Sequence, residues 1–135
     1  MPPTDRGTRI AHIGIAVRDI ESLLPFFRDV LGLPEISLAN SDGARIAGLA
    51  AGPSLIELLE SSMAGTPVAK YIEKRGPGIH HICFAVDDLD ASLQRCREAG
   101  IRLVDDAPRV GAEGKRIAFL HPGSTGGVLV ELTEK

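Results

Sequence analysis

The sequence predicts an α+β fold built from two βαβββ modules, and two repeated segments are the main reason. Ala11–Ile20 reappears as His80–Leu89, and Leu55–Glu60 reappears as Leu129–Glu134. Strand-like alternation and helix-like stretches recur in the same order around both copies. The chain has 135 residues, the length of one ordinary domain. We therefore expect a single domain over 1–135, with module one at about 8–60, a connector helix at 66–76 and module two at about 78–135.

The first module begins with a strand and a helix. Between Arg9 and Val17, large apolar residues alternate with small or polar ones, which predicts a strand with two different faces. Asp19 or Ser22 can cap the helix that follows, which should end near residue 31, before a glycine. Pro25 would remove a hydrogen bond inside a helix starting at Asp19, but it is tolerated in the first turn of one starting at Ser22. We therefore favour the later start, or a kink.

Three short strands and a connector helix complete the first half. The strands are expected at Glu35–Leu38, Ala44–Ala50 and Ser54–Glu60, separated by turn-forming residues. Thr66 as N-cap and Pro67 at the first helical position form a good helix start. The cations Lys74 and Arg75, followed by Gly76, are typical of a helix end.

The second module repeats this order. A strand is expected at Gly78–Val86 and a helix from Asp88 to Ala99, with Gly100 directly behind it. Three further strands should lie near Arg102–Asp105, Lys115–Leu120 and Val128–Thr133. We interpret Gly123–Gly127 as a hairpin turn, because it lacks the spacing and the lysine of a phosphate-binding loop.

The repeat places two histidines and two glutamates at matching positions. His12 superposes on His81, and Glu57 superposes on Glu131. Strand alternation puts all four on one side of the sheet, so we expect them to line a concave surface. Two half-buried carboxylates facing each other are costly, and a divalent cation removes that cost. We predict a metal site formed by these four residues; imidazole and carboxylate suit Zn, Co, Ni, Mn or Fe and leave coordination positions open.

Each residue also has an ordinary structural interpretation. A single histidine in a strand is more often a hydrogen-bonded core residue, and a single glutamate is more often a charge on an edge strand. Four such residues at repeat-equivalent positions are hard to explain in that way, so we favour the metal site. We interpret His80 as a structural polar group beside the site, and His121, before Pro122, as a turn residue.

Composition argues against several classes of partner. The net charge of −3 and the absence of tryptophan give no reason to expect nucleic acid. No apolar run approaches membrane-spanning length, and Met1–Gly7 is too short and too polar for a targeting segment. Cys83 and Cys96 do not make a disulfide framework. We therefore expect reduced thiols, no membrane contact and a cytoplasmic location.

Segments along nearly the whole chain after the first eight residues carry a family resemblance. They are His12–Val17, Ile56–Glu60, Pro67–Gly76, Gly78–Ile82, Gly111–Lys115, Phe119–Pro122 and Gly126–Leu132. With the paired modules and the two His/Glu pairs, the chain resembles the vicinal-oxygen-chelate superfamily, which includes glyoxalase I, extradiol dioxygenases and fosfomycin-resistance proteins. Within it, the chain most resembles the methylmalonyl-CoA epimerase family. The resemblance implies His12, His81 and Glu131 as metal ligands, Glu57 at the fourth position, a homodimer and a coenzyme A thioester substrate.

The reaction implied is interconversion of (2R)- and (2S)-methylmalonyl-CoA by removal and return of the α-proton through a metal-stabilised enolate, with Co²⁺ as the first candidate metal. Inversion needs proton transfer on two opposite faces, and the internal duplication offers two carboxylates. We expect Glu131 to be the first catalytic base and Glu57 the second. Some epimerases carry an additional glutamate in the central strand of the first module, whereas Gly43–Gly48 contains no acid.

Other residues are candidates for the substrate's phosphates. Lys115 and Arg116, with Arg109, lie in and beside a basic loop. They are equally well explained by solubility.

Two alternative functions stay open. A glyoxalase I-type lactoylglutathione lyase would use the same ligand types, although the segment after Glu57, with its helix at Thr66–Gly76, resembles the epimerases. A non-catalytic small-molecule binder of the same fold would need an aromatic pocket. The chain has four Phe, one Tyr and no Trp, which are few aromatic side chains to line such a pocket.

Overall fold

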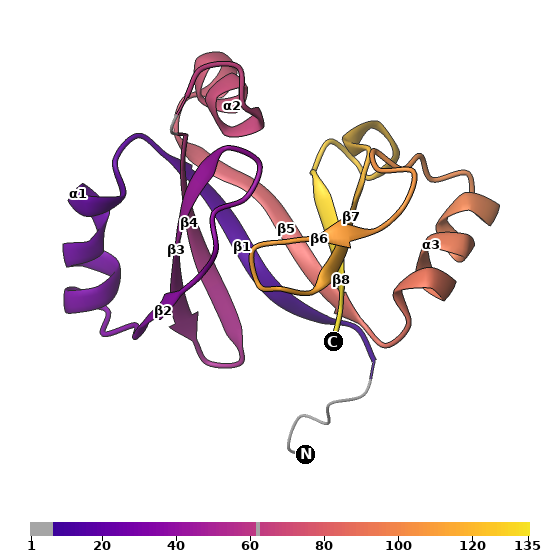
Figure 1. Ribbon diagram of the computed structural model, residues 1–135, viewed down its shortest axis with the longest axis horizontal. Coiled ribbons are helices and arrows are strands. Elements are labelled where there is room, and N and C mark those ends of the chain that lie inside the picture. Colours follow the sequence, from indigo (N-terminus) through magenta and orange to yellow (C-terminus); the bar gives the residue numbers. More distant parts are fainter. Residues whose placement is uncertain (1–6, 62) are drawn as a thin grey trace.

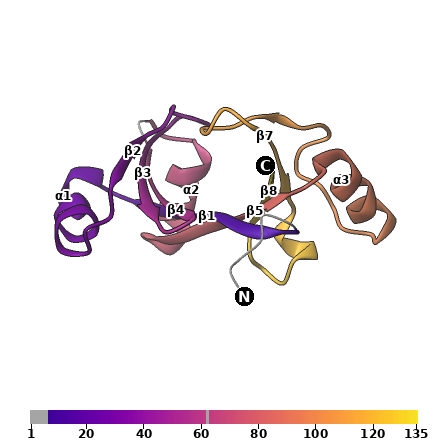
Figure 2. The ribbon, with the colours of Figure 1, turned by 90° about the horizontal axis from the view of Figure 1, so that it is seen from below.

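The computed structural model describes residues 7–61 and 63–135, so the segment considered above as a targeting sequence lies almost entirely outside the described residues. Its strands form one sheet of eight, in the order β2-β3-β4-β1-β5-β8-β7-β6. The sheet is strongly curled; α1 and α3 flank its two sides, and α2 lies at its upper rim (Figure 1; Figure 2). The predicted α+β class with paired βαβββ modules is confirmed.

Both modules contain the predicted sequence of elements. The first comprises β1 (Arg9–Val17), α1 (Ile20–Leu24), the π-helical segment η1 (Pro25–Val30), β2 (Glu35–Ser37), β3 (Ala44–Ala51) and β4 (Ser54–Ser61). After the connector α2 (Pro67–Arg75), the second comprises β5 (Gly78–Val86), α3 (Leu89–Glu98), β6 (Arg109–Val110), β7 (Arg116–Leu120), the 3-10 turn η2 (Pro122–Ser124) and β8 (Val130–Glu134). The modules join where β1 pairs antiparallel with β5. Within each module, the first strand pairs in parallel with the last.

Each module has its own apolar core between its helix and its strands, and the two cores are repeat-equivalent. The first is made of Val17, Ile20, Leu24, Ala47, Leu49 and Leu58. Taken in the same order, the second is made of Val86, Leu89, Leu93, Ala118, Leu120 and Leu132. Because the apolar side of each half sheet is packed on a helix, the opposite side of the four central strands is left to form the concave surface.

The first helix differs from the expectation. Asp19, not Ser22, is the N-cap, and its side chain accepts a hydrogen bond from the Glu21 N–H at 3.2 Å. α1 continues directly into η1, where the Leu31 N–H donates to the Phe26 carbonyl, five residues back, at 2.9 Å. The favoured start at Ser22 is therefore wrong. The irregularity that proline introduces takes the form of a π-helical turn.

The strand expected at Arg102–Asp105 is also wrong. Only Leu103 forms an isolated bridge there, with Leu120, and the strand beside β7 is instead the two-residue β6. The reason lies in a side chain: the Phe119 N–H, which a neighbouring strand would use, donates to the Asp105 carboxylate at 2.8 Å. The Asp105 carboxylate thus takes the place of a backbone carbonyl as the acceptor, and the pairing of this segment with β7 ends there.

Two helix caps and one turn agree with the predictions. Thr66 and Asp88 cap α2 and α3 through their side-chain oxygens. His121 is a turn residue, because its Nδ1 accepts a hydrogen bond from the Gly123 N–H at 2.9 Å. Cys83 and Cys96 are free thiols. None of the described helices is long and apolar enough to cross a membrane.

Candidate metal centre

The central strand pair brings the two predicted histidines together. In the antiparallel register of β1 and β5, Gly14 lies opposite His81 and His12 lies opposite Cys83. A Cβ atom at Gly14 would come within 2.2 Å of the His81 ring. Glycine therefore leaves the space that the imidazole occupies, and the Nε2 atoms of His12 and His81 lie 2.9 Å apart.

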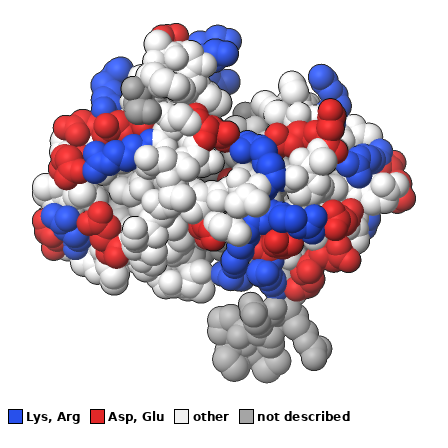
Figure 3. Space-filling model, in the orientation of Figure 1, with Lys and Arg blue, Asp and Glu red and all other residues white. Residues whose placement is uncertain are grey.

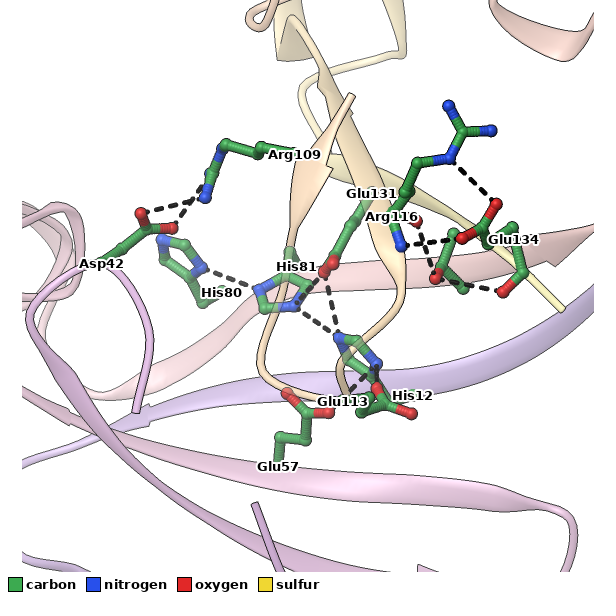
Figure 4. A network of polar contacts seen from close by, with 11 residues as sticks. His12, Asp42, Glu57, His80, His81, Arg109, Glu113, Arg116, Glu131 and Glu134 are labelled. Carbon is green, nitrogen blue, oxygen red and sulfur yellow. Dashed lines mark hydrogen bonds and ion pairs between the residues drawn. The ribbon is translucent and has the colours of Figure 1, made fainter. Parts of the chain in front are cut away.

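Glu131 on β8 completes this contact. Its Oε1 lies 3.1 Å from His12 Nε2 and 3.0 Å from His81 Nε2 (Figure 4). All three side chains are buried. Three atoms that can each donate an electron pair to a cation thus converge, from strands far apart in the sequence, at one point of the concave surface.

Glu57 lies beside the other ring nitrogen of His12, Nδ1. Its Oε2 lies 3.2 Å from His12 Nδ1, and the residue is 3% exposed. Among the described residues neither atom makes a hydrogen bond of normal geometry, although the two lie within ion-pair distance of each other. A buried polar atom without a partner is costly and indicates a group that the protein alone does not supply.

A third carboxylate at the site was not predicted. Glu113, in the loop between β6 and β7, places its Oε2 2.7 Å from His12 Nδ1. This loop was interpreted as a basic one. A signal was present in the repeat, because Glu113–Gly114 is equivalent to Asp42–Gly43, and both glycines have positive φ at a hairpin tip.

Cys83 is a second residue that sequence reasoning missed. Its sulfur, with His12 and Glu131, forms a group whose ligand atoms lie within 4.8 Å of one another. Burial raises the pKa of this thiol to about 11. Because the thiolate and not the thiol is the metal ligand, Cys83 is a weaker ligand candidate than the carboxylates.

The electrostatics of the cluster favour positive charge at its centre. Burial alone would raise the pKa of Glu131, but hydrogen bonds to His12 and His81 lower it to about 2. Burial likewise opposes the imidazolium form of His12, yet contacts with Cys83, Glu113 and Glu131 raise its pKa to about 12. Burial raises the pKa of Glu57 to about 8. These directions describe a site with more carboxylates than its imidazoles can neutralise.

The donor set therefore fits a divalent cation. It combines imidazole nitrogens with carboxylate oxygens and holds excess negative charge in a buried position. A cation would neutralise the carboxylates.

His80 lies beside the cluster as predicted, with its Nδ1 3.0 Å from His81 Nδ1. Burial is the main reason why its pKa falls to about 4, so His80 is a neutral imidazole at neutral pH. In this form it offers polar contact to the site without adding charge.

The predicted phosphate ligands lie away from the cluster. Arg116 pairs with Asp90 at 3.1 Å and with Glu134 at 3.1 Å. Lys115 is exposed, and neither residue lines the cavity above the histidines. Arg109 makes a two-bonded contact with the Asp42 carboxylate (Figure 4). Phosphate binding by Lys115 and Arg116 stays a prediction, in which phosphate would compete with two carboxylates for Arg116.

A cavity of about 570 Å³, its mouth included, opens above the cluster. Its floor is formed by the four predicted ligands, and apolar side chains including Ile46, Val68 and Phe119 form its walls.

Comparison with known proteins places the chain in a family. Residues 11–119 match the family model of the glyoxalase/bleomycin resistance protein/dioxygenase superfamily. An ethylmalonyl-CoA/methylmalonyl-CoA epimerase of Cereibacter sphaeroides is 37% identical over 131 residues, 93% of this chain and 97% of that protein.

Two solved structures agree. A methylmalonyl-CoA epimerase from Mycobacterium tuberculosis superposes with a TM-score of 0.90 at 38% identity, over 99% of this chain and 92% of that one. A methylmalonyl-CoA epimerase in complex with methylmalonyl-CoA and NH4+ gives the same score and identity, over 96% and 95%. The curled sheet, the paired modules and these matches lead to one conclusion: the chain belongs to the methylmalonyl-CoA epimerase family of the glyoxalase superfamily, a family of isomerases.

Proposed function

We propose that this protein is a metal-dependent epimerase that interconverts (2R)- and (2S)-methylmalonyl-CoA by removing and returning the α-proton. The observation that carries the proposal is the convergence of His12, His81 and Glu131 within 3.1 Å of one another, in a chain of this family. The similar protein solved with methylmalonyl-CoA supports an acyl-CoA thioester as the substrate.

His12, His81 and Glu131 would hold the cation through the three atoms that converge, and Glu57, which lies at the other ring nitrogen of His12, is our candidate for the fourth position. Co²⁺ is our first choice among the divalent metals. When bound, it supplies Lewis-acid stabilisation for negative charge that develops on a carbonyl oxygen. The chain's own contribution is a fixed and dry ligand set, because all four residues are 5% exposed or less.

Proton transfer is assigned to the two glutamates. Glu57 on β4 and Glu131 on β8 reach opposite ring nitrogens of His12, so they approach the cavity floor from two sides. Removing a proton from one face of the α-carbon and delivering one to the other inverts the centre. A carboxylate can accept the proton as a general base and return one as a general acid.

The first test is deuterium incorporation at the α-carbon of methylmalonyl-CoA in deuterium oxide, followed by mass spectrometry. Exchange should be lost with EDTA and restored by Co²⁺. Activity on methylglyoxal with glutathione, and none on the CoA thioester, would favour the glyoxalase I alternative.

Glu57→Gln and Glu131→Gln test the roles of the carboxylates, with metal content measured for each variant. We expect each to lose at least about a hundredfold in exchange rate. Glu98→Gln, at an exposed position on α3, should behave as wild type. Full exchange in both site variants with metal still bound would exclude these residues as the bases.

A homodimer and a cytoplasmic location, both predicted above, also stay proposals. Sedimentation of the purified protein tests the first directly. Fractionation of cells tests the second.

A further inference from the structure

Acidic side chains line the metal cavity at four positions, and three of them already have a partner or a role. The four are Asp42, Glu57, Glu113 and Glu131. Glu131 lies within 3.1 Å of two imidazole nitrogens, and Glu57 is our candidate for the fourth ligand position. Asp42 accepts two hydrogen bonds from the Arg109 guanidinium. Among the described residues that line the cavity, Glu113 is the acid that remains.

Glu113 is also more open to the cavity than the other two glutamates. Its side chain is 26% exposed, compared with 3% for Glu57 and 6% for Glu131. Its Oε2 lies 2.7 Å from His12 Nδ1, but within the described part of the chain that nitrogen makes no hydrogen bond of normal geometry. The Glu113 carboxylate is therefore neither fully buried nor committed to the ring, and it can meet a molecule that enters the cavity.

The hairpin tip that carries Glu113 is held in place by the opposite module. The Ala112 carbonyl accepts a hydrogen bond from the Ala39 N–H at 3.2 Å. Arg109, at the foot of the same hairpin, donates its two bonds to Asp42. In Figure 3, acidic and basic side chains lie side by side near the middle of the face, between the two modules. Because a general base must be held close to the atom that it deprotonates, this restraint on the backbone suits a catalytic role.

The central strand of the first module gives no acid to the cavity. β3 contributes Ala44 and Ile46 there, which are both apolar. Inversion of a carbon centre needs proton transfer on two opposite faces, and a carboxylate that binds a cation is a weaker base than a free one. Glu131 and Glu113 lie at different ring nitrogens of His12, Nε2 and Nδ1, so they flank the cavity floor from two sides.

We propose that Glu113 is a catalytic residue that transfers the proton on the Glu57 side of His12, while Glu131 serves the other side. The inference rests on the proposed function and narrows it, because Glu57 then stays with the cation. On one face, the α-carbon–hydrogen bond breaks, its proton moves to the Glu113 carboxylate, and its electron pair is delocalised onto the adjacent carbonyl. On the other face, Glu131 in its acid form delivers a proton, and the electron pair forms the new carbon–hydrogen bond. Exchange with water then returns both carboxyl groups to their starting states.

The test follows the two epimers of methylmalonyl-CoA separately in deuterium oxide, with Co²⁺ well above the dissociation constant of each protein. Mass spectrometry measures deuterium at the α-carbon, and circular dichroism measures inversion. In Glu113→Gln, inversion should fall at least about a hundredfold in both directions. The epimer whose α-proton faces Glu131 should still exchange it, at a rate within about tenfold of wild type, and the other epimer should not exchange.

Three further variants serve as comparisons, with the cobalt content of each measured by metal analysis. Glu113→Asp keeps a carboxylate and should recover part of the inversion. Glu57→Gln should lower the exchange of both epimers alike, because it acts through the cation and not on one face. Glu98→Gln, at an exposed position on α3, should match wild type.

A purely structural role for Glu113 would lower the exchange of both epimers alike, and this result would overturn the proposal. Full inversion in Glu113→Gln would overturn it as well. If Glu57→Gln and not Glu113→Gln shows exchange of one epimer without inversion, the second proton-transfer role belongs to Glu57. If the wild-type protein loaded with Co²⁺ exchanges neither epimer, the proposed function fails and the inference fails with it. Inversion in wild type and in Glu113→Gln alike would remove the inference alone.

Discussion

The two modules of this protein share their skeleton and differ at the metal site. Their cores match residue for residue, from Val17 and Val86 to Leu58 and Leu132. Even an ion pair is repeated, because Arg45 contacts Glu21 at the start of α1 and Arg116 contacts Asp90 at the start of α3.

The differences concentrate where the halves face each other. Gly14 in β1 corresponds to Cys83 in β5, and the hairpin tip of module one ends in Asp42 where that of module two ends in Glu113. Asp42 is held by Arg109, whereas Glu113 contacts His12. Duplication thus supplies a symmetric ligand set, and single substitutions make its two sides unequal.

Among the substitutions that probe this difference between the two modules, Gly14→Ala should have the largest effect. The new Cβ would lie 2.2 Å from the His81 ring, so the imidazole must leave its position. We expect a loss of about 1–3 kcal/mol in the free energy of unfolding, measured by urea denaturation, and no detectable cobalt in the purified protein.

Two variants control for this prediction. Cys83→Ala, at the repeat-equivalent position, should keep its cobalt, because a buried thiol with a raised pKa is a poor ligand. Gly78→Ala, where a Cβ meets only the Tyr71 hydroxyl at 3.4 Å, should keep its cobalt as well. Normal metal content in G14A would refute the claim that the His81 ring needs the space that Gly14 leaves.

Glu113→Gln should have the next largest effect. It removes the carboxylate nearest His12 Nδ1. Substituting a residue that contacts a metal ligand in this way typically lowers the metal affinity about tenfold or more. Asp42→Asn, the same change in the equivalent hairpin, should alter cobalt affinity by less than about twofold, since Arg109 holds Asp42 away from His12. Calorimetric titration with Co²⁺ measures both, and equal losses would show that the hairpins act alike.

The helix caps should show the smallest difference. Asp88→Ala removes the side chain that accepts from the Ala91 N–H at 3.0 Å and should cost about 1 kcal/mol of unfolding free energy. Asp19→Ala should cost about half as much, because Glu60 also accepts a hydrogen bond from the Ile20 N–H at 2.7 Å at the same helix start. Thermal denaturation of the two variants decides between this order and its reverse.

The repeat made most of the fold predictable, because a strand found in one copy could be checked against the other. The predictions failed where one copy departs from its partner. Asp19 and Gly32 are one residue further apart than Asp88 and Gly100, and the π-helical turn at Pro25 absorbs that residue. Periodicity within a single helix does not reveal an insertion of this kind.

The site was predictable to the extent that it lies on strands. Alternation assigned His12, His81, Glu57 and Glu131 to one surface, and the structure brings them together. Glu113 was not predicted, because the conformation of its loop decides where its side chain lies. The composition of that loop suggested only a basic turn. The roles of these residues, and the limits of the two modules, stay predictions.

The ligands of the candidate metal centre come from opposite ends of the chain, since His12 is 69 residues from His81 and 119 from Glu131. No local segment can form the site on its own, so the cation can be held only after both modules have folded and docked through β1 and β5. Metal binding then acts as a non-covalent cross-link whose free energy adds to the cooperativity of folding. The protein would report the loss of its cation as a lower melting temperature for the whole molecule, not for one half.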